Sequence, residues 1–126
     1  MGLGLLFPTI ATAAFDRGWS ANLLARVTAT EPARTFGLYP RKGVIRVGSD
    51  ADVLIVDPSH MQPISAIPSY SSADHCIYEG MPGLYLRAVF SRGRLLARDG
   101  DYVGPHGGGT FVPGTLSTRD GATLPV

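Results

Sequence analysis

The chain has 126 residues, of which 44% are hydrophobic and 17% are charged. This length suffices for one domain around a single core, and the composition is typical of a folded chain rather than a disordered one. Lys and Arg number 11 and Asp and Glu number 10, giving a formal net charge of +1 without any block of like charge. Such a charge pattern excludes the basic footprint of nucleic-acid-binding proteins, and we expect no nucleic-acid partner.

The single cysteine and the apolar N-terminus bear on the compartment. Cys76 alone excludes an internal disulfide and a cysteine-based metal cluster, and its side chain is expected to be a buried or half-buried apolar group. The stretch MGLGLLFPTIATAAF resembles a secretory leader in outline, but no Lys or Arg precedes it, Arg17 being the first. It is interrupted by Pro8 and is shorter than the roughly 18 apolar residues that span a bilayer. We interpret it as a buried helix and expect a cytoplasmic protein without a membrane partner.

The first third of the chain is expected to form three short helices. Apolar residues recur at spacings of three and four between Leu3 and Asp16, which is typical of a helix packed on one face, and Gly18 ends it. The stripe consists of Leu3, Leu6, Phe7, Ile10, Ala13 and Ala14.

Ser20 is a candidate N-cap for the second helix. Its inward-facing residues would be Leu23, Leu24 and Val27. Thr30 is a candidate N-cap for the third helix, with Pro32 in the first turn and Gly37 just past the end, where a left-handed residue is common.

From Tyr39 the apolar period becomes two, or continuous and β-branched. Residues Val44 to Val47 and Asp52 to Asp57 are predicted to be strands, with turn residues VGSDAD between them. The Pro- and Ser-rich stretch from Pro58 to Ser72 predicts an extended surface loop. The stretch LYLRAVFSRGRLLARDGDYV predicts strands joined by tight turns at Arg92-Gly93 and Asp99-Gly100. From Gly104 the chain predicts a tail that is poorly ordered at its end.

Four stretches of the chain are TATEPARTFGLYPRKGVIRVGSDADVLIVDP, YEGMPG, AVFSRGRLLARDGDYVG and GGGTFVPG. Together they resemble the C-terminal part of the cyclic amidases of the amidohydrolase superfamily, namely dihydropyrimidinase, hydantoinase and allantoinase. The resemblance covers about Leu3 to Gly114 and implies an α+β fragment. Residues 1–38 would be the terminal helices of a (β/α)8 barrel, residues 39–103 the C-terminal half of a small β-sandwich, and residues 104–126 an irregular tail. The stretch from Met61 to Cys76 and the start of the next strand at Pro82 depart from the family pattern, which leaves the substrate subtype open.

The resemblance implies a hydrolase that uses a pair of divalent ions, zinc foremost, to open a cyclic amide, and a homo-oligomeric intact protein. Such a centre needs several ligands converging on one cavity. The three histidines, His60, His75 and His106, form no HxH pair and no pair four residues apart. We therefore expect no catalytic, cofactor-binding or metal-binding residue in this chain, and no activity from it alone.

Two other polar groupings have a structural and a chemical interpretation. Asp50 and Asp52 could act as paired carboxylates, but a role in satisfying turn backbone is favoured. The stretch Pro40 to Gly43, with two adjacent cations, could bind an anion, but a solvated turn is favoured. Trp19, the single tryptophan, is expected to anchor the core between two helices.

Three overall interpretations remain at this point. The first is a segment of a cyclic amidase, and the second is a non-catalytic binding or assembly module of the same family, as in the collapsin response mediator proteins that lack the metal ligands. An unrelated small β-sandwich is the third. Helices and strands shaped to cover absent elements would expose apolar surface, so we expect the chain to pair with the missing barrel segment or with itself.

Overall fold

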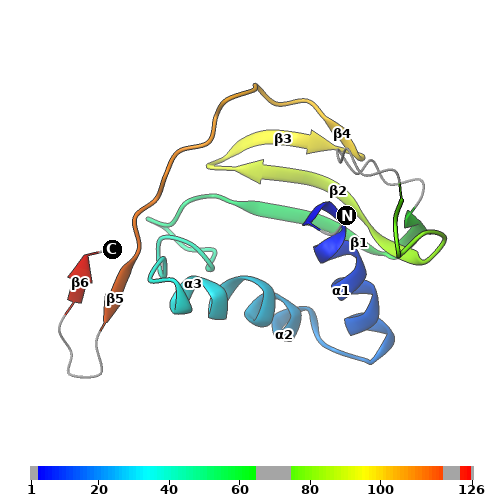
Figure 1. The fold of residues 1–126 in the computed structure, drawn as a ribbon, viewed down its shortest axis with the longest axis horizontal. Coiled ribbons are helices and arrows are strands. Elements are labelled where there is room, and N and C mark those ends of the chain that lie inside the picture. Colours follow the sequence, from blue (N-terminus) through cyan, green and yellow to red (C-terminus); the bar gives the residue numbers. More distant parts are fainter. Residues whose placement is uncertain (1–2, 65–74, 118–122, 126) are drawn as a thin grey trace.

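A computed structural model describes residues 3–64, 75–117 and 123–125. In this part of the chain, helices are followed by a four-stranded antiparallel sheet of order β1-β2-β3-β4 and then by a two-stranded sheet (Figure 1). The elements are a 3₁₀ helix (Leu3–Leu5), α1 (Leu6–Asp16), α2 (Ala21–Ala25), a π-helical segment (Arg26–Thr30), α3 (Glu31–Thr35), β1 (Val53–Pro63), β2 (Pro82–Ser91), β3 (Arg94–Arg98), β4 (Asp101–Tyr102), β5 (Thr115–Ser117) and β6 (Thr123–Pro125). Among the described helices, none has the length and hydropathy that a bilayer crossing requires.

Helix α1 packs against β2, and the core lies between them. Ala11, Ala14 and Leu24 are buried with Leu84 of β2. The predicted span of this helix is confirmed. The predicted stripe is right for Ala14, which is buried, and for Phe7, which packs against the core, but wrong for Leu6 and Ile10, which are 56% and 36% exposed. The small side chains of Ala11 and Ala14 let the helix lie close to β2, so the face that carries these alanines is the buried one.

The predicted second and third helices form one continuous helical stretch from Ala21 to Thr35. The Ser20 hydroxyl accepts a hydrogen bond from the Leu23 amide at 3.2 Å, which confirms this cap. The predicted cap at Thr30 is wrong. Its backbone is helical, and its hydroxyl donates to the carbonyl oxygen of Gly43 at 2.7 Å. The π-helical segment carries the chain through this point without a break, so no new N-terminus needs a cap.

Two further expectations for the helical region have opposite outcomes. Gly37 has a φ of +67°, as predicted for the residue after a helix. Val27 and Trp19, expected to face inward, are 44% and 37% exposed, because among the described residues no layer covers that side of the helices.

The predicted strand from Val44 to Val47 is wrong, since these residues form bends and turns. Ile45 is 85% exposed and Val47 is fully exposed. A strand requires a neighbour for its backbone hydrogen bonds, and no described segment pairs with this one.

The sheet contains the two predicted tight turns. Arg92 and Gly93 have φ values of 49° and 76°, and Asp99 and Gly100 have φ values of 50° and 91°. Positive φ at both central residues is the conformation that joins two strands through a two-residue turn with the right twist. Both turn predictions are confirmed.

Strand β1 is longer than predicted and irregular. It continues from Val53 to Pro63, into the stretch predicted to be a loop, and the rest of that loop to Ser72 lies outside the described residues. Its register with β2 shifts between Asp57, which pairs with Tyr85, and Met61, which pairs with Leu84. The intervening residues bulge out of the ladder, which is how β1 accommodates a proline.

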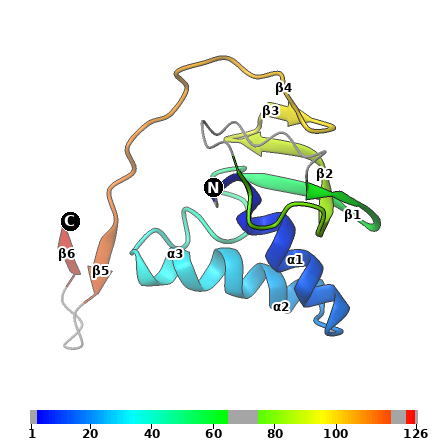
Figure 2. The same ribbon diagram turned by 45° about the vertical axis from the view of Figure 1, so that its right-hand side comes forward.

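The C-terminal region is an extended arm that returns to the helices (Figure 2). It leaves β4, runs back past the β3 edge of the sheet and ends in the β5–β6 pair near the end of α3. The Thr115 amide donates to the Gly37 carbonyl oxygen at 2.8 Å. The expectation of an irregular tail is therefore wrong for β5 and β6, while the expected poor order at the end falls mainly on residues outside those described.

Candidate functional site

The charged residues of the segment from Pro40 to Asp52, called the signature loop below, bind one another. The Lys42 ammonium lies 2.8 Å from a carboxylate oxygen of Asp50 and also contacts Asp52, while Arg41 pairs with Asp50 at 3.1 Å. The Ser49 hydroxyl donates to the Pro40 carbonyl oxygen at 2.6 Å. These contacts close the segment from Pro40 to Asp52 into a loop with a polar interior.

This loop is also tied to the hairpin of β2 and β3, which is called the first hairpin below. A carboxylate oxygen of Asp52 accepts a hydrogen bond from the Arg92 amide at 2.8 Å, and the Gly93 amide donates to the Ala51 carbonyl oxygen at 2.9 Å. The aspartates thus satisfy backbone and pair with cations, which agrees with their favoured structural interpretation. The pairing of Lys42 with both aspartates was missed, although the opposite charges on either side of one turn indicate it.

The pairing shifts the ionisation of these groups. Hydrogen bonding to Lys42 lowers the pKa of Asp50. Burial opposes ionisation of Asp52, but the hydrogen bonds from Lys42 and the Arg92 amide outweigh it and lower its pKa. Burial likewise opposes charge on Lys42, and its two aspartate partners outweigh this and raise its pKa. All three groups are therefore held in their charged forms, which suits a structural ion pair and not an acid–base catalyst.

A second charged cluster covers the sheet where β1, β2 and the turn after β3 meet. Arg87 pairs with Asp57 at 3.2 Å and with Asp99 at 3.5 Å, and the Tyr85 hydroxyl donates to Asp99 at 3.2 Å. The His60 ring stacks on Tyr85 with centroids 4.5 Å apart. Hydrogen bonds from the Ser59 side chain and amide, together with Arg87, lower the pKa of Asp57.

The histidines do not converge. His60 lies in the irregular part of β1, His75 is exposed, and His106 is tilted against Tyr102 at 5.3 Å. Within residues 3–64, 75–117 and 123–125, no group of three His, Cys, Asp or Glu side chains has the arrangement of a metal site. The donor set of the described residues therefore does not fit a metal pair. Cys76 is half-buried with a free thiol, as expected.

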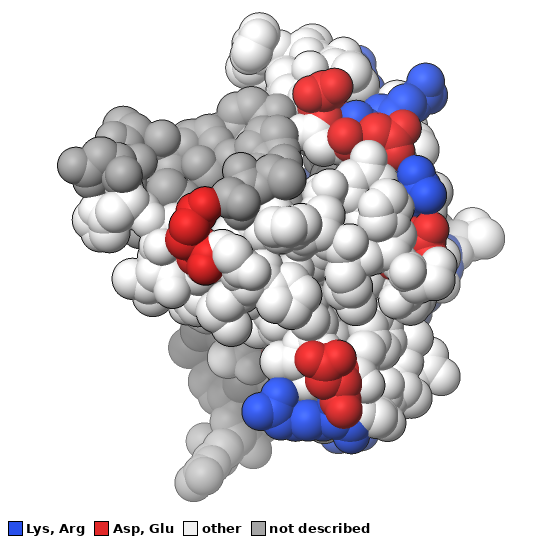
Figure 3. Space-filling view, turned by 90° about the vertical axis from the view of Figure 1, so that its right-hand side faces the viewer, with Lys and Arg blue, Asp and Glu red and all other residues white. Residues whose placement is uncertain are grey.

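Opposite charges alternate over the surface. Figure 3 shows acidic and basic side chains side by side on one face, separated by broad uncharged areas. Large apolar side chains are also exposed. Among the described residues, those at least two-thirds exposed are Phe36, Ile45, Val47, Ile77 and Phe111.

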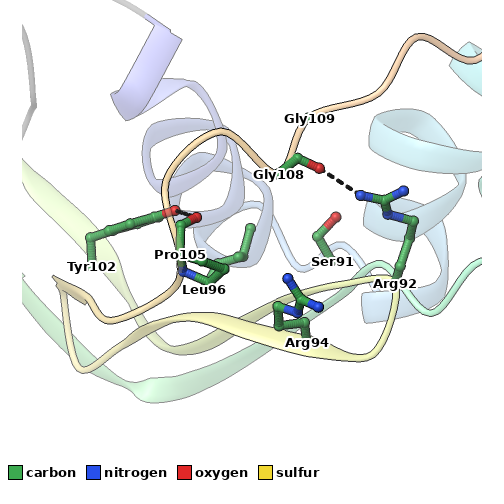
Figure 4. Close-up of a pocket in the computed structure, with 8 residues that line it drawn as sticks. All are labelled: Ser91, Arg92, Arg94, Leu96, Tyr102, Pro105, Gly108 and Gly109. Carbon is green, nitrogen blue, oxygen red and sulfur yellow. Dashed lines mark hydrogen bonds between the residues drawn. The ribbon is translucent and has the colours of Figure 1, made fainter.

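A pocket of about 450 Å³ lies between the first hairpin and the start of the arm (Figure 4). Its walls are Ser91, Arg92, Arg94, Leu96, Tyr102, Pro105, Gly108 and Gly109. The Arg92 guanidinium donates to the Gly108 carbonyl oxygen at 2.6 Å and to the Thr110 hydroxyl at 3.1 Å. Sequence reasoning missed this pocket, since only the fold brings the arm over the SRGR turn.

Comparison with known proteins gives concordant results. Residues 4–96 match the model of the amidohydrolase family. The chain is similar to a D-hydantoinase of Streptomyces coelicolor, with 39% identity over 69% of this chain and 19% of the relative. It is also similar to a D-phenylhydantoinase of Escherichia coli O127:H6, with 38% identity over 74% of this chain and 20% of the relative.

Solved structures agree with these relatives. A D-hydantoinase structure superposes with a TM-score of 0.75 and 30% identity, covering 84% of this chain and 23% of the other. A D-hydantoinase (dihydropyrimidinase) from a Thermus species gives a TM-score of 0.73 and 32% identity, covering 82% and 23%. The chain spans about a fifth of the length of the curated relatives that it matches.

Proposed function

Because the chain belongs to the amidohydrolase family, we propose that it is a C-terminal scaffold segment of an enzyme that hydrolyses a C–N bond in a cyclic amide. The observation that carries this proposal is the similarity in both sequence and fold to hydantoinases over most of this chain but about a fifth of theirs. The segment would be inactive alone. We place the enzyme in the cytoplasm, as the single half-buried thiol fits a reducing compartment.

In this proposal the helices from Leu3 to Thr35 are the last helices of a (β/α)8 barrel, and the sheet β1-β2-β3-β4 is half of a β-sandwich. The exposed sides of Val27 and Ile10 support the first part, because barrel helices have a second apolar side that faces strands or neighbouring helices. The isolated loop from Val44 to Val47 supports the second part, since its β-branched residues would become a strand once a partner strand is present.

The catalytic chemistry would come from residues outside this sequence. Amide hydrolysis at neutral pH by this family's chemistry needs a bound divalent metal pair to activate water. The described residues do not supply a converging donor set, and the charged side chains of the signature loop are committed to one another. The role of this chain would be to hold the loop from Pro40 to Asp52 against the first hairpin and so brace the end of the barrel.

The same proposal includes a partner. Phe36, Ile45, Val47, Ile77 and Phe111 are exposed, and soluble monomers rarely tolerate so many large apolar side chains on their surface. The barrel segment would cover part of this surface, and a second copy of the intact enzyme would cover the remainder as a homo-oligomer.

The test is a comparison of the 126-residue chain alone with the chain co-expressed with the coding sequence that adjoins it upstream. Hydantoin and dihydrouracil ring opening and bound zinc are measured for both samples. We expect activity and zinc only in the joint sample. A chain that alone binds two zinc ions and opens either ring contradicts the proposal, and a stable pair that binds no zinc and opens no ring favours the non-catalytic module.

A further inference from the structure

The pocket between the first hairpin and the arm has a positively charged wall. Arg92 and Arg94 are its cations, and among the described residues no aspartate or glutamate lines it. Figure 4 shows the Arg94 guanidinium rising from β3 into the space between Leu96 and Arg92. Within the described part of the chain, no hydrogen bond or ion pair holds the Arg94 side chain.

Arg92 is held in place by the arm. Its two hydrogen bonds, to the Gly108 carbonyl oxygen and the Thr110 hydroxyl, fix the guanidinium plane. A guanidinium has more N–H donors than these two, so Arg92 keeps donors for a ligand. Fixing a cation in advance reduces the entropy lost when an anion binds.

Asp52, which adjoins this wall through its bond to the Arg92 amide, is already paired with a cation. Asp52 is paired with Lys42 and accepts a hydrogen bond from the Arg92 amide. The Asp52 carboxylate therefore does not compete with a ligand for the two guanidinium groups.

The remaining walls are apolar or uncharged. Leu96 and Pro105 lie beside the arginines, and Gly108 and Gly109 leave open space where other residues would place a side chain. The volume of about 450 Å³ falls within the range of small-molecule sites.

We propose that this pocket binds a small molecule that carries an oxyanion group, a carboxylate or a phosphate, on an apolar body. The oxyanion would lie between Arg92 and Arg94, because the planar fork of a guanidinium matches two oxygens of either group. The apolar body would lie against Leu96 and Pro105. This proposal does not depend on the reaction of the parent enzyme.

The experiment is a titration of the 126-residue chain, joined to its partner segment where the pair is the soluble species, followed by amide NMR. Benzoate and phenyl phosphate are the probes, and benzyl alcohol is the uncharged counterpart. Both anions are expected to shift the Gly108 and Gly109 amides at low salt and to lose affinity at high salt. The anion that binds more tightly identifies the ligand class.

The matched variants are Arg94→Gln and Arg98→Gln. Both residues are exposed on β3, but Arg98 does not line the pocket. Arg94→Gln is expected to weaken binding about tenfold and Arg98→Gln by less than about twofold. An unchanged amide spectrum elsewhere shows that each variant is folded.

Three results overturn the proposal. One is the absence of any shift with either anion, and another is equal binding by the native chain and Arg94→Gln. The third is an equal effect of benzyl alcohol at the same resonances, which would make the site an apolar cleft without anion recognition.

Discussion

Replacing Asp52 by alanine removes the side-chain contact between the signature loop and the first hairpin and leaves the backbone bond from Gly93 to Ala51. The native carboxylate accepts a hydrogen bond from the Arg92 amide at 2.8 Å and pairs with Lys42. Alanine loses both interactions, whereas Asp52→Asn keeps an oxygen acceptor and loses the charge. The two variants therefore separate the hydrogen bond from the ion pair.

The expected magnitudes follow from the exposure of the groups. A hydrogen bond to a charged group contributes about 1.5–3 kcal/mol, and an ion pair near the surface contributes about 0.2–1 kcal/mol. The Asp52 side chain is 37% exposed, so water screens both interactions and the lower ends of these ranges apply. We expect the free energy of unfolding to fall by about 2 kcal/mol for Asp52→Ala and by about 1 kcal/mol for Asp52→Asn.

Urea unfolding measures this difference, with fluorescence of the single Trp19 and circular dichroism as probes. With an m-value of about 2 kcal/mol per molar urea, Asp52→Ala should lower the midpoint by about 1 M at unchanged m. Asp101→Ala, at an exposed position of β4, is the control. Equal midpoints for Asp52→Ala and Asp101→Ala would refute the assignment of Asp52 as a brace between loop and hairpin.

Three further outcomes are expected. Leu84 is fully buried, so Leu84→Ala should lower the free energy of unfolding by about 3 kcal/mol in the same urea assay. The methyl group of Gly114→Ala would overlap the Phe36 carbonyl oxygen, so this variant should reduce hydrogen-exchange protection at the start of β5. The pKa of Asp50 and of Asp57 is lowered on folding, so the stability these groups add is complete above about pH 4 and is lost as the pH falls through their folded pKa values.

Each of these outcomes has a control or a contrary result. Leu54→Ala, at a 42% exposed position of β1, should cost much less than the change at the core leucine. Gly108→Ala adds a methyl group that meets no atom within 4 Å and should leave exchange protection of β5 unchanged. Stability that stays constant from pH 5 to the acid limit would contradict the ion-pair account of the aspartates.

Features that depend on a few neighbouring residues were predictable from the sequence. The cap at Ser20, the left-handed Gly37 and the turns at Arg92 and Asp99 all follow from local backbone preferences. The charged loop was predictable in part, since a structural role for its aspartates could be inferred without their partners.

Features that depend on distant parts of the chain were not predictable. Whether Val44 to Val47 form a strand depends on a partner strand, and the described residues offer none. The buried face of α1 depends on how closely it approaches β2, which apolar spacing alone does not specify. The arginine pocket required the arm to cross the hairpin, a contact between segments separated by two turns.

The π-helical segment determines how the buried side of α2 is oriented relative to the buried side of α3. Leu24 and Ala33 are both buried, and nine positions separate them, which is about two and a half turns of a regular α-helix. Regular winding would place them on opposite sides, whereas the wider coil of Arg26–Thr30 reduces this rotation. Deleting one residue from Arg26–Thr30 would restore regular α-helical winding. Ala33 would then turn away from Gly43, and the signature loop would lose its contact with the helix.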